Sequence, residues 1–579
     1  MSATAAALAA ALGAALLTST ADAAAPPVPT GVTPGPTTVT RAELVDRVTG
    51  ALAEDDLPGQ GNKTSLSTGG SVAGGKEAKI IGGTTTGITS APWMAQLWYF
   101  DDRGTTGTAD DIGFFCGGAV VSPTKILTAA HCVKGYNWYA NGTVITDTAK
   151  LPTDTGTDGT VRLPLRQWQH PSYNARTLDN DIAVITLDIP VKSKPIPMTT
   201  AGDTASYAAG TSAKVYGWGR TSSTSDEISP LLKTATLPLQ SDTTCTRAWG
   251  TEFVKGHMVC AGKPATGSDT GTVSACNGDS GGPLVVNNRI IGVVSWGVED
   301  CVARGAYSVF TKVTSYVGAV YPRIDDSNLS RDSRADMWVR KSADKMGYSK
   351  ASKGTTFDAR EELGTWDGVN KVLQTDLDRD GFQDIVYRRS SDGDVFWRHY
   401  VPASDKEVTT KLADNWKTRT QIVVPGDVTG DYLPDLLSVD SGGVLWIYPG
   451  KGNGTFSPRV RFGGGWSQYN VLLGHGDFTG DGRTDLIARA RTGSAVYLYK
   501  GTGKSGSAAF SARIKVRTWS GFNAFDAVGD ITGDGRADLL ARTPAGTLSL
   551  YPGTGKANSE IFATAITIGT DFKQYDIFG

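Results

Sequence analysis

The stretch CNGDSGGPL at residues 276–284 places a serine, Ser280, between an aspartate and two glycines in a predicted tight turn. A nucleophilic serine needs this setting, because its hydroxyl must be exposed and nearby backbone N–H groups must converge where an oxyanion forms. Gly278 leaves room for a substrate carbonyl to approach the backbone. A glycine-rich surface turn is the alternative interpretation, and partners elsewhere in the chain are needed to decide between the two.

Two such partners lie upstream of Ser280. His131 stands in TAAHC at 128–132, after an apolar run, and Asp181 stands in DNDIAV at 179–184. Serine is a poor nucleophile at neutral pH and needs a base. Histidine is that base, and a buried carboxylate holds its tautomer and stabilises the imidazolium. The three residues therefore predict a catalytic triad, with the N–H groups of Gly278 and Ser280 as the oxyanion hole.

Residues 80–324 resemble the trypsin/chymotrypsin family of serine proteases. The His, Asp, Ser order is that of chymotrypsin, and further motifs follow in family order: KIIGG at 79–83, YGWG at 216–219, SWG at 295–297 and VFTKV at 309–313. The resemblance implies a double β-barrel and a serine endopeptidase that acts on protein or peptide substrates without a cofactor. Short apolar runs separated by turns are consistent with this all-β fold.

Substrate choice in this family depends on the residue six positions before the nucleophile, which is Ser274 here. A neutral pocket base does not offset the desolvation of Arg or Lys, so we expect an apolar residue before the scissile bond. Glu299 and Asp300 near the pocket mouth could instead attract a basic residue. The other expected pocket residues are Ser295, Gly297 and Ser308.

The resemblance also implies activation by cleavage after Lys79. The freed ammonium of Ile80 would pair with Asp279 and bring the 278–280 backbone into the oxyanion geometry, which we expect to be malformed before cleavage. Since an apolar pocket should not accept lysine, we expect a separate trypsin-like protease to perform the cleavage.

Six cysteines, all between positions 116 and 301, indicate an oxidising compartment. Their number alone allows fifteen pairings. The family resemblance implies the pairs Cys116–Cys132, Cys245–Cys260 and Cys276–Cys301.

The N-terminal segment has the features of a secretory leader. An Ala/Leu run at 5–17 is followed by Ala21-Asp22-Ala23, and it is too short for a transmembrane helix. No Lys or Arg precedes the run, a departure that is consistent with a truncated start. We expect a signal peptide at 1–23, a propeptide at 24–79 and a secreted, extracellular protein. The propeptide is interpreted either as a zymogen latch or as a disordered leader.

The charges of the chain are almost balanced. The 579 residues carry 56 Lys+Arg and 58 Asp+Glu, a net charge of −2 that gives no indication of nucleic acid or a charged membrane surface. The 71 glycines indicate turn-rich β structure.

The C-terminal third contains an acidic repeat. Four strong copies begin at Asp376, Asp427, Asp477 and Asp530, and a degenerate copy begins at Asn328; the starts are 48, 51, 50 and 53 residues apart. Oxygens at loop positions 1, 3, 5 and 9 suit a hard cation such as calcium. The candidate ligands are Asp376, Asp378, Asp380, Asp384, Asp427, Thr429, Asp431, Asp435, Asp477, Thr479, Asp481, Asp485, Asp530, Thr532, Asp534 and Asp538.

The repeats resemble the FG-GAP/VCBS repeats of integrin-like β-propellers, since each loop runs into a strand pair. This resemblance implies a propeller of about five blades over 325–579, with structural rather than catalytic calcium. The residues around 574–576 are similar in sequence to the strand that precedes each loop. We therefore expect the C-terminus to complete the first blade. A partial or open propeller is the alternative.

Two features of the chain each allow two interpretations, one with a bound ligand and one without. A tryptophan lies ten or eleven residues before each strong loop, at Trp366, Trp416, Trp466 and Trp519. Such aromatics either stack on a polysaccharide or another extracellular surface ligand, or wedge between blades. The acidic insertion at 101–111 is either a calcium loop or a solvated hairpin.

Taken together, these patterns predict a secreted serine endopeptidase with a calcium-binding propeller for targeting or stability. The alternative is an adhesion or lectin-like binding protein with a vestigial protease domain. The intact triad favours the enzyme.

Overall fold

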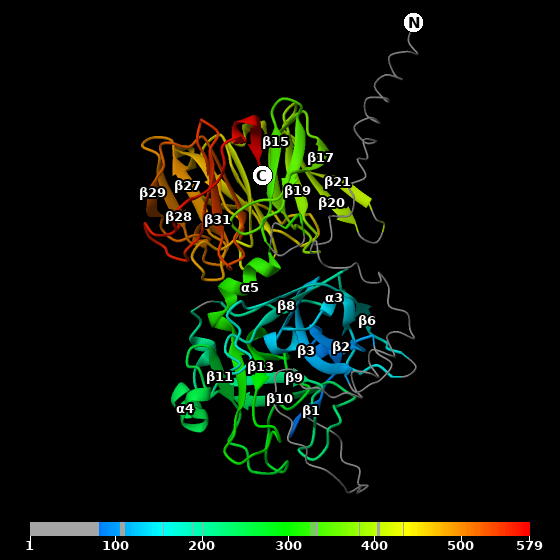
Figure 1. Ribbon diagram of the computed structural model, residues 1–579. Helices are drawn as coiled ribbons and strands as arrows, with labels where there is room; N and C mark the ends of the chain where they lie inside the picture. The colour runs from blue at the N-terminus through cyan, green and yellow to red at the C-terminus, as the bar shows by residue number, and fades with distance from the viewer. Residues whose placement is uncertain are drawn as a thin grey trace.

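The computed structural model describes residues 80–579 except 105–109, 154–155, 189, 201, 326–327, 331–333, 381, 402–403, 405 and 432. The predicted signal peptide, the propeptide and Lys79 lie outside the described residues, as does part of the acidic insertion. Two β-rich domains follow one another along the chain, with helix α5 (Val317–Ile324) between them (Figure 1).

Two seven-stranded antiparallel sheets build the first domain. The first sheet contains, in spatial order, β6 (Thr160–Arg162), β5 (Gly142–Thr146), β2 (Met94–Asp101), β3 (Ile112–Ser122), β4 (Lys125–Thr128), β8 (Ala183–Leu187) and β7 (Pro164–Gln169). The second contains β1 (Thr84–Thr85), β10 (Lys233–Pro238), β9 (Ser212–Gly217), β12 (Pro283–Val286), β13 (Arg289–Trp296), β14 (Ser308–Lys312) and β11 (Met258–Ala261).

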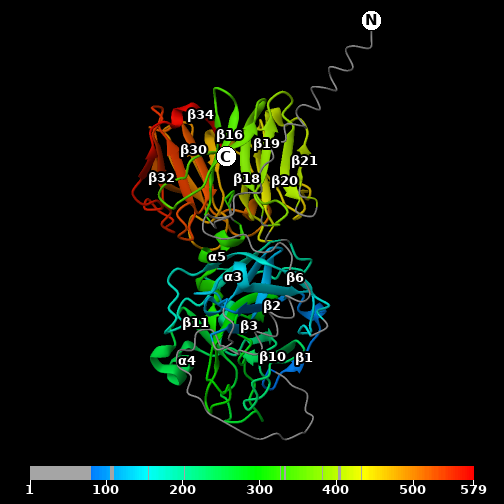
Figure 2. The same ribbon diagram turned by 45° about the vertical axis from the view of Figure 1, so that its right-hand side comes forward.

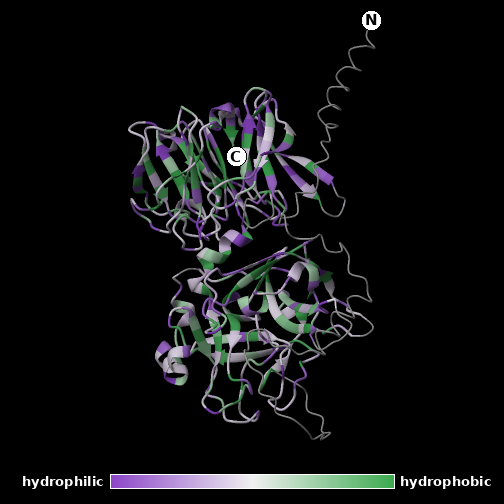
Figure 3. Cartoon of the chain, viewed as in Figure 1, coloured by the Kyte–Doolittle hydropathy of each residue, from purple (hydrophilic) through white to green (hydrophobic). Residues whose placement is uncertain are grey.

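Apolar strands explain why this domain closes on itself. β3 reads IGFFCGGAVVS and is buried along almost its whole length, as expected of a strand covered on both faces. Trp98 on β2 and Trp138, two of the largest side chains in the core of this domain, have no exposed surface. Figure 3 shows the apolar residues concentrated on the strands. The predicted all-β double barrel is confirmed.

Helices within the described residues are short. The α-helices are α3 (Trp138–Asn141), α4 (Asp242–Trp249) and α5. The 3-10 helices are η1 (Ile88–Ser90), η2 (Ala130–Cys132), η3 (Ala205–Tyr207), η4 (Gly250–Glu252), η5 (Val313–Ser315), η6 (Trp416–Thr418), η7 (Trp466–Gln468), η8 (Gly506–Ala508) and η9 (Phe572–Gln574). None of the helices in the described part of the chain is long and apolar enough to span a membrane.

Five four-stranded antiparallel blades form the second domain. The first two are β17 (Glu361–Thr365), β16 (Met346–Lys350), β15 (Met337–Lys341), β34 (Tyr575–Phe578), and β18 (Val369–Thr375), β19 (Asp384–Arg389), β20 (Val395–Val401), β21 (Lys406–Ala413). The third is β22 (Gln421–Gly426), β23 (Asp435–Val439), β24 (Leu445–Tyr448), β25 (Val460–Gly463). The last two are β26 (Tyr469–Leu473), β27 (Leu486–Ala490), β28 (Ala495–Tyr499), β29 (Ile514–Thr518), and β30 (Ala524–Gly529), β31 (Asp538–Arg542), β32 (Leu548–Tyr551), β33 (Ile566–Gly569).

The ring is closed by the end of the chain. β34 pairs with β15, so the C-terminal strand completes the first blade. Both ribbon views place the C-terminus within the ring (Figures 1 and 2), where Gln374 Nε2 donates a 2.6 Å hydrogen bond to the Gly579 carbonyl. The closed five-bladed propeller is thus the correct alternative, and the open form is not found.

The repeat tryptophans pack between blades. Trp366, Trp466 and Trp519 are buried, and Trp416 is half-buried. Trp366 meets Trp338 of the first blade and Tyr387 of the second. Trp366, Trp466 and Trp519 are therefore wedges of the core and not a platform for sugar stacking, whereas Trp416 keeps part of its surface exposed.

In four blades, an arginine lies four residues after the last aspartate of the repeat. Its guanidinium donates a hydrogen bond to the backbone carbonyl of the repeat tryptophan or, in one case, of Phe572, and we call this contact an arginine pin. Arg388 and Arg489 donate to the main-chain carbonyls of Trp416 and Trp519, respectively. Arg340 and Arg542 make the same contact with Trp366 and Phe572. The third blade has Val439 at this position and lacks the contact.

Candidate active site

His131 and Asp181 are brought together by strand pairing. His131 lies in η2, directly after β4, and Asp181 lies two residues before β8. β4 and β8 are antiparallel neighbours in which Thr128 faces Ala183. The register therefore places the segments that carry His131 and Asp181 side by side at the same end of the strand pair. The disulfide between Cys116 and Cys132 ties this turn to β3.

Asp181 is fully buried and holds His131 with both carboxylate oxygens. Oδ1 accepts the His131 backbone N–H at 2.8 Å, and Oδ2 lies 2.7 Å from His131 Nδ1. A carboxylate only accepts, so Nδ1 carries the proton and Nε2 is left as the base. The hydroxyl of Ser295 also donates to Oδ2 at 2.6 Å, and Thr311 Oγ1 donates to the Asp181 carbonyl at 2.6 Å.

Ser280 lies in the turn before β12, against the His131 segment. Its carbonyl accepts from Gly117 N at 2.7 Å. Gly281 has φ +80°, and a Cβ there would lie 2.1 Å from Thr128 Oγ1. Only glycine therefore allows this close approach. Within the described residues the Ser280 hydroxyl makes no hydrogen bond to His131, and such contacts often tighten only when substrate binds.

The turn leaves two N–H groups available. Within the described part of the chain, the backbone N–H groups of Gly278 and Ser280 donate to no protein acceptor. Gly278 has φ +87°, and a Cβ would lie 2.8 Å from Ile228. Two free N–H donors beside a serine can hold the oxyanion of an acyl-transfer reaction where they point to one spot.

Comparisons with known proteins agree with this geometry. The trypsin family model matches residues 80–320. Trypsin of Saccharopolyspora erythraea is 38% identical over 246 residues, which cover 42% of this chain and 98% of that protein. Kallikrein-14 of Homo sapiens is 36% identical, over 42% of this chain and 82% of its own length. Trypsin-3 of Salmo salar is 34% identical, over 42% of this chain and 91% of its own length.

The chain belongs to the trypsin family. Its trypsin domain is a serine endopeptidase, and the three relatives named above each match 42% of the chain. A model of FG-GAP-like repeats matches residues 477–541 within that propeller.

Asp279, the neighbour of Ser280 in the trypsin domain, is fully buried. It accepts the N–H groups of Gly219 at 2.8 Å and Cys276 at 2.9 Å. Burial raises the pKa of Asp279 to about 7, and the two N–H donors oppose this rise. Ile80, the expected ammonium partner, is buried in the core of the second sheet.

The base of the predicted pocket is neutral and its hydroxyls are engaged. Ser274 Oγ donates to the Cys301 carbonyl at 2.8 Å, and Ser308 Oγ accepts from Ala275 N at 3.0 Å. At Gly297 no atom lies within 4 Å of where a Cβ would be, so this wall is open. The hydroxyl of Ser295, which is also an expected pocket residue, donates to Asp181.

The acids at the pocket mouth differ in their contacts. Asp300 Oδ1 accepts the N–H groups of Val302 and Ala303 at 3.1 and 2.9 Å, so this carboxylate caps its own loop. Glu299 is exposed. The disulfides Cys276–Cys301 and Cys245–Cys260 are present in the pairing that the resemblance implied.

The acidic loops of the propeller bring oxygens together. Carboxylate oxygens of Asp376, Asp378 and Asp384 lie within 4.8 Å of one another. Burial, and then the neighbouring carboxylates, raise the pKa of Asp384 well above its usual range. Within the described residues of the four strong loops, four buried oxygens lack a hydrogen-bond partner: Asp378 Oδ1, Asp384 Oδ1, Thr429 Oγ1 and Asp481 Oδ1.

This donor set fits calcium. All the donors are hard oxygens, and the crowded carboxylates need positive charge to remain ionised together. Backbone N–H groups of Gly480 and Gly482 hold Asp477, the first residue of its loop, in place. The first and last aspartates of each strong loop are buried.

Sequence reasoning missed the contact of Ser295 with Asp181 and the contact of Thr311 with the same residue. Both residues belong to motifs of the family resemblance, SWG at 295–297 and VFTKV at 309–313. The signal available was the small hydroxyl residue at the end of a buried strand, where a polar partner is needed.

Proposed function

We propose that the chain is a secreted serine endopeptidase that cleaves after an apolar residue and carries calcium in its propeller. The observation that carries the catalytic part is the fully buried Asp181, which holds His131 through two contacts next to the two free N–H donors of Gly278 and Ser280. No observation favours the adhesion alternative.

The reaction is acyl transfer. Ser280 Oγ attacks the peptide carbonyl while His131 Nε2 takes its proton and then gives it to the leaving amine. Asp181 holds the His131 tautomer. The N–H groups of Gly278 and Ser280 stabilise the oxyanion. Water that His131 activates then releases the acyl-enzyme.

Cleavage after an apolar residue is supported by the pocket base. The Ser274 hydroxyl donates to a main-chain carbonyl, so it offers no charge to a substrate Lys or Arg. Burying such a cation without a partner is costly. A consequence is that a different, trypsin-like protease cleaves after Lys79 during activation.

The role of Asp279 in activation is supported by its burial. A buried carboxylate held by two N–H groups is stabilised further by a positive charge, and the Ile80 ammonium supplies one after cleavage. The segment that begins at Ile80 already packs in the second barrel.

Calcium in the acidic loops would be held by the aspartates and threonines at positions 1, 3 and 5 and the aspartate at position 9. The cation would offset their mutual repulsion and fix the loop backbone. Its role is structural. The propeller adds stability or targets the protease to an extracellular surface or polysaccharide through residues other than the buried tryptophans.

The organisation follows as a signal peptide at 1–23, a propeptide at 24–79, the protease at 80–324 and the propeller at 325–579. Secretion is supported by the three disulfides, since these persist in oxidising compartments.

Active-site labelling tests the catalytic proposal. Material cut after Lys79 is treated with an organofluorophosphonate, and the labelled residue is identified by mass spectrometry. We expect labelling at Ser280, which Ser280→Ala and His131→Ala both abolish while the fold is retained. A chain that cleaves no peptide and takes no label would contradict the proposal and support the binding-protein alternative.

A further inference from the structure

Helix α5, the last element of the trypsin domain, lies against the acidic-loop face of the propeller (Figures 1 and 2). The contact is close enough to require glycine on both sides. A Cβ on Gly318 of α5 would lie 2.6 Å from the Gly480 carbonyl oxygen in the third strong loop. A Cβ on Gly482 would lie 2.1 Å from Val317 Cγ1, so the loop backbone also packs closely against a side chain of the helix.

Arg323 of α5 joins the two domains through a buried ion pair. Its Nη2 donates to Asp530 Oδ2 at 2.8 Å and to the Gly533 carbonyl at 3.1 Å, both in the fourth strong loop. The guanidinium also lies 5.3 Å from the ring centroid of Trp168 on β7. With 3% of its side chain exposed, Arg323 is held between a protease strand and a propeller loop.

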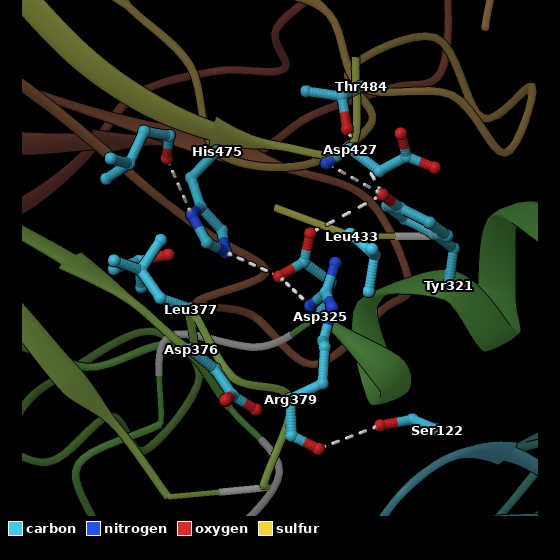
Figure 4. Close-up of polar contacts among 12 residues, drawn as sticks. Ser122, Tyr321, Asp325, Asp376, Leu377, Arg379, Asp427, Leu433, His475 and Thr484 are labelled. Carbon is cyan, nitrogen blue, oxygen red and sulfur yellow. Dashed lines mark hydrogen bonds and ion pairs between the residues drawn. The ribbon is translucent and has the colours of Figure 1, made fainter. Parts of the chain in front are cut away.

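Asp325, the C-cap residue of α5, enters the propeller (Figure 4). Its Oδ1 lies 2.5 Å from Arg379 Nη1 in the first strong loop and 3.7 Å from His475 Nε2. Oδ2 accepts the Tyr321 hydroxyl at 3.4 Å. A Cβ at Gly426 would lie 2.3 Å from Oδ2, so a side chain there would exclude the carboxylate.

Tyr321 and Ser122 extend the same network. The Tyr321 hydroxyl accepts from Asp427 N at 3.3 Å, in the second strong loop, and lies 3.2 Å from Thr484 Oγ1. Ser122 at the end of β3 donates to the Arg379 carbonyl at 3.2 Å (Figure 4). One short helix and its cap thus contact all four strong loops.

We propose that the acidic-loop face is the docking surface for the protease's own helix α5, and that cation binding in the loops controls how firmly the two domains are joined. The cation part rests on the calcium sites proposed above. Cation binding fixes loop backbones, and these backbones form the surface that α5 contacts. A docked face is closed to outside ligands, so external binding uses another face of the propeller.

The proposal changes the expected relation between the domains. A chain cut before Asp325 leaves Arg323 without Asp530, and it also removes the cap of α5. The trypsin domain therefore depends on the propeller for stability. Loss of activity after deletion of the propeller is consequently no proof of targeting.

A glycine substitution tests docking in the full chain with calcium present. Alanine is a better helix former than glycine, so intrinsic propensity predicts that Gly318→Ala stabilises α5. Docking predicts the opposite, because the new Cβ meets the Gly480 carbonyl. Gly521→Ala is the matched control, since no atom lies within 4 Å of its Cβ position.

We expect wild type and Gly521→Ala to unfold in one calorimetric transition and to scatter X-rays as one compact particle. Gly318→Ala should give two transitions and a larger radius of gyration. Labelling of Ser280 reports that the trypsin domain of each variant is folded. Tyr321→Phe retains the ring and loses only the hydroxyl, so it should separate the two transitions by a smaller temperature difference than Gly318→Ala. Tyr448→Phe should leave the single transition of the wild type unchanged. Gly318→Ala behaviour identical to wild type overturns the docking proposal.

Calcium dependence is measured separately on the wild-type chain. Equilibrium dialysis determines whether calcium binds, and calorimetry and scattering are repeated in EGTA. We expect bound calcium, and separate transitions and an extended particle in EGTA. Binding without any effect of EGTA overturns the coupling alone. Absence of binding overturns the calcium proposal, while docking is still decided by Gly318→Ala.

Discussion

The trypsin domain and the propeller build their sites in opposite ways. The candidate active site joins residues far apart in the chain: Asp181 contacts His131 across 50 positions and Ser295 across 114. Each acidic loop instead draws its oxygens from nine consecutive residues. A long-range site exists only when the whole double barrel is folded, whereas a local site recurs wherever its short pattern is copied.

The two domains also differ in what stabilises them. All six cysteines lie in the trypsin domain and form three disulfides. The propeller sequence contains no cysteine. Its blades are joined by tryptophan wedges, arginine pins and the strand β34. Covalent cross-links thus support one domain and repeated non-covalent contacts the other.

Single substitutions should separate the two kinds of site most strongly. Ser280→Ala removes the nucleophile and should lower kcat by roughly 10⁴- to 10⁶-fold. Asp538→Asn changes one of several equivalent loops and should leave kcat on a small peptide unchanged within about twofold. Steady-state kinetics on material cut after Lys79 measures both. A large loss of kcat in Asp538→Asn would show that the loops act on the catalytic groups directly.

Reductant should act mainly on the trypsin domain and chelator mainly on the propeller, with a smaller effect on the other domain because α5 couples the two. Reduction should lower the unfolding free energy of the trypsin domain by roughly 2–5 kcal/mol per disulfide. EGTA should lower that of the propeller by about 2.7 kcal/mol for each site held at a hundredfold excess of calcium over Kd. Urea unfolding followed by domain-specific hydrogen exchange distinguishes them. Equal effects of both reagents on both domains would contradict the comparison.

The buried Asp279 should make the uncleaved chain sensitive to pH. Its pKa is raised to about 7, above the unfolded value, so its stabilising contribution is complete below about pH 4 and is lost as pH rises through 7. The loss is at most on the order of 4 kcal/mol. Urea unfolding between pH 4 and 8 should show a slope that Asp279→Asn reduces; parallel curves would contradict this.

The arginine pins should have the smallest effect. Arg489→Val removes the 2.9 Å hydrogen bond to the Trp519 carbonyl and should cost about 1–3 kcal/mol of propeller stability. The third blade, with Val439 at the same position, shows that a blade forms without it. Lys451→Val, at an exposed position, is the control. Equal midpoints of chemical unfolding for the two variants would show that the pin contributes nothing.

Sequence patterns were sufficient wherever the information is local or is marked by motif order. The nine-residue loops predicted five blades, and the echo of a strand near 574–576 predicted the closing partner of the first blade. The double barrel followed from motifs around His131, Asp181 and Ser280, whose order and spacing resemble a known family.

Contacts between distant segments were not predictable. Nothing near Ser295 in the chain indicates that its hydroxyl contacts Asp181, because the strand register decides this. The glycines at 318 and 480 are each ordinary in sequence, and only their apposition shows that α5 docks on a loop. The tryptophan spacing was compatible with both a wedge and a binding platform until burial distinguished them.

The specificity of the pocket is the most direct test of the enzyme described here. After cleavage at Lys79, kcat/KM is measured on matched peptides that differ only in the residue before the scissile bond, Phe or Leu against Arg, with Ser280→Ala as the blank. The neutral base at Ser274 predicts a preference for Phe or Leu of at least about tenfold, and Ser274→Asp should shift it toward Arg. A wild-type preference for Arg would contradict the account and would show that acids such as Glu299 override the neutral base.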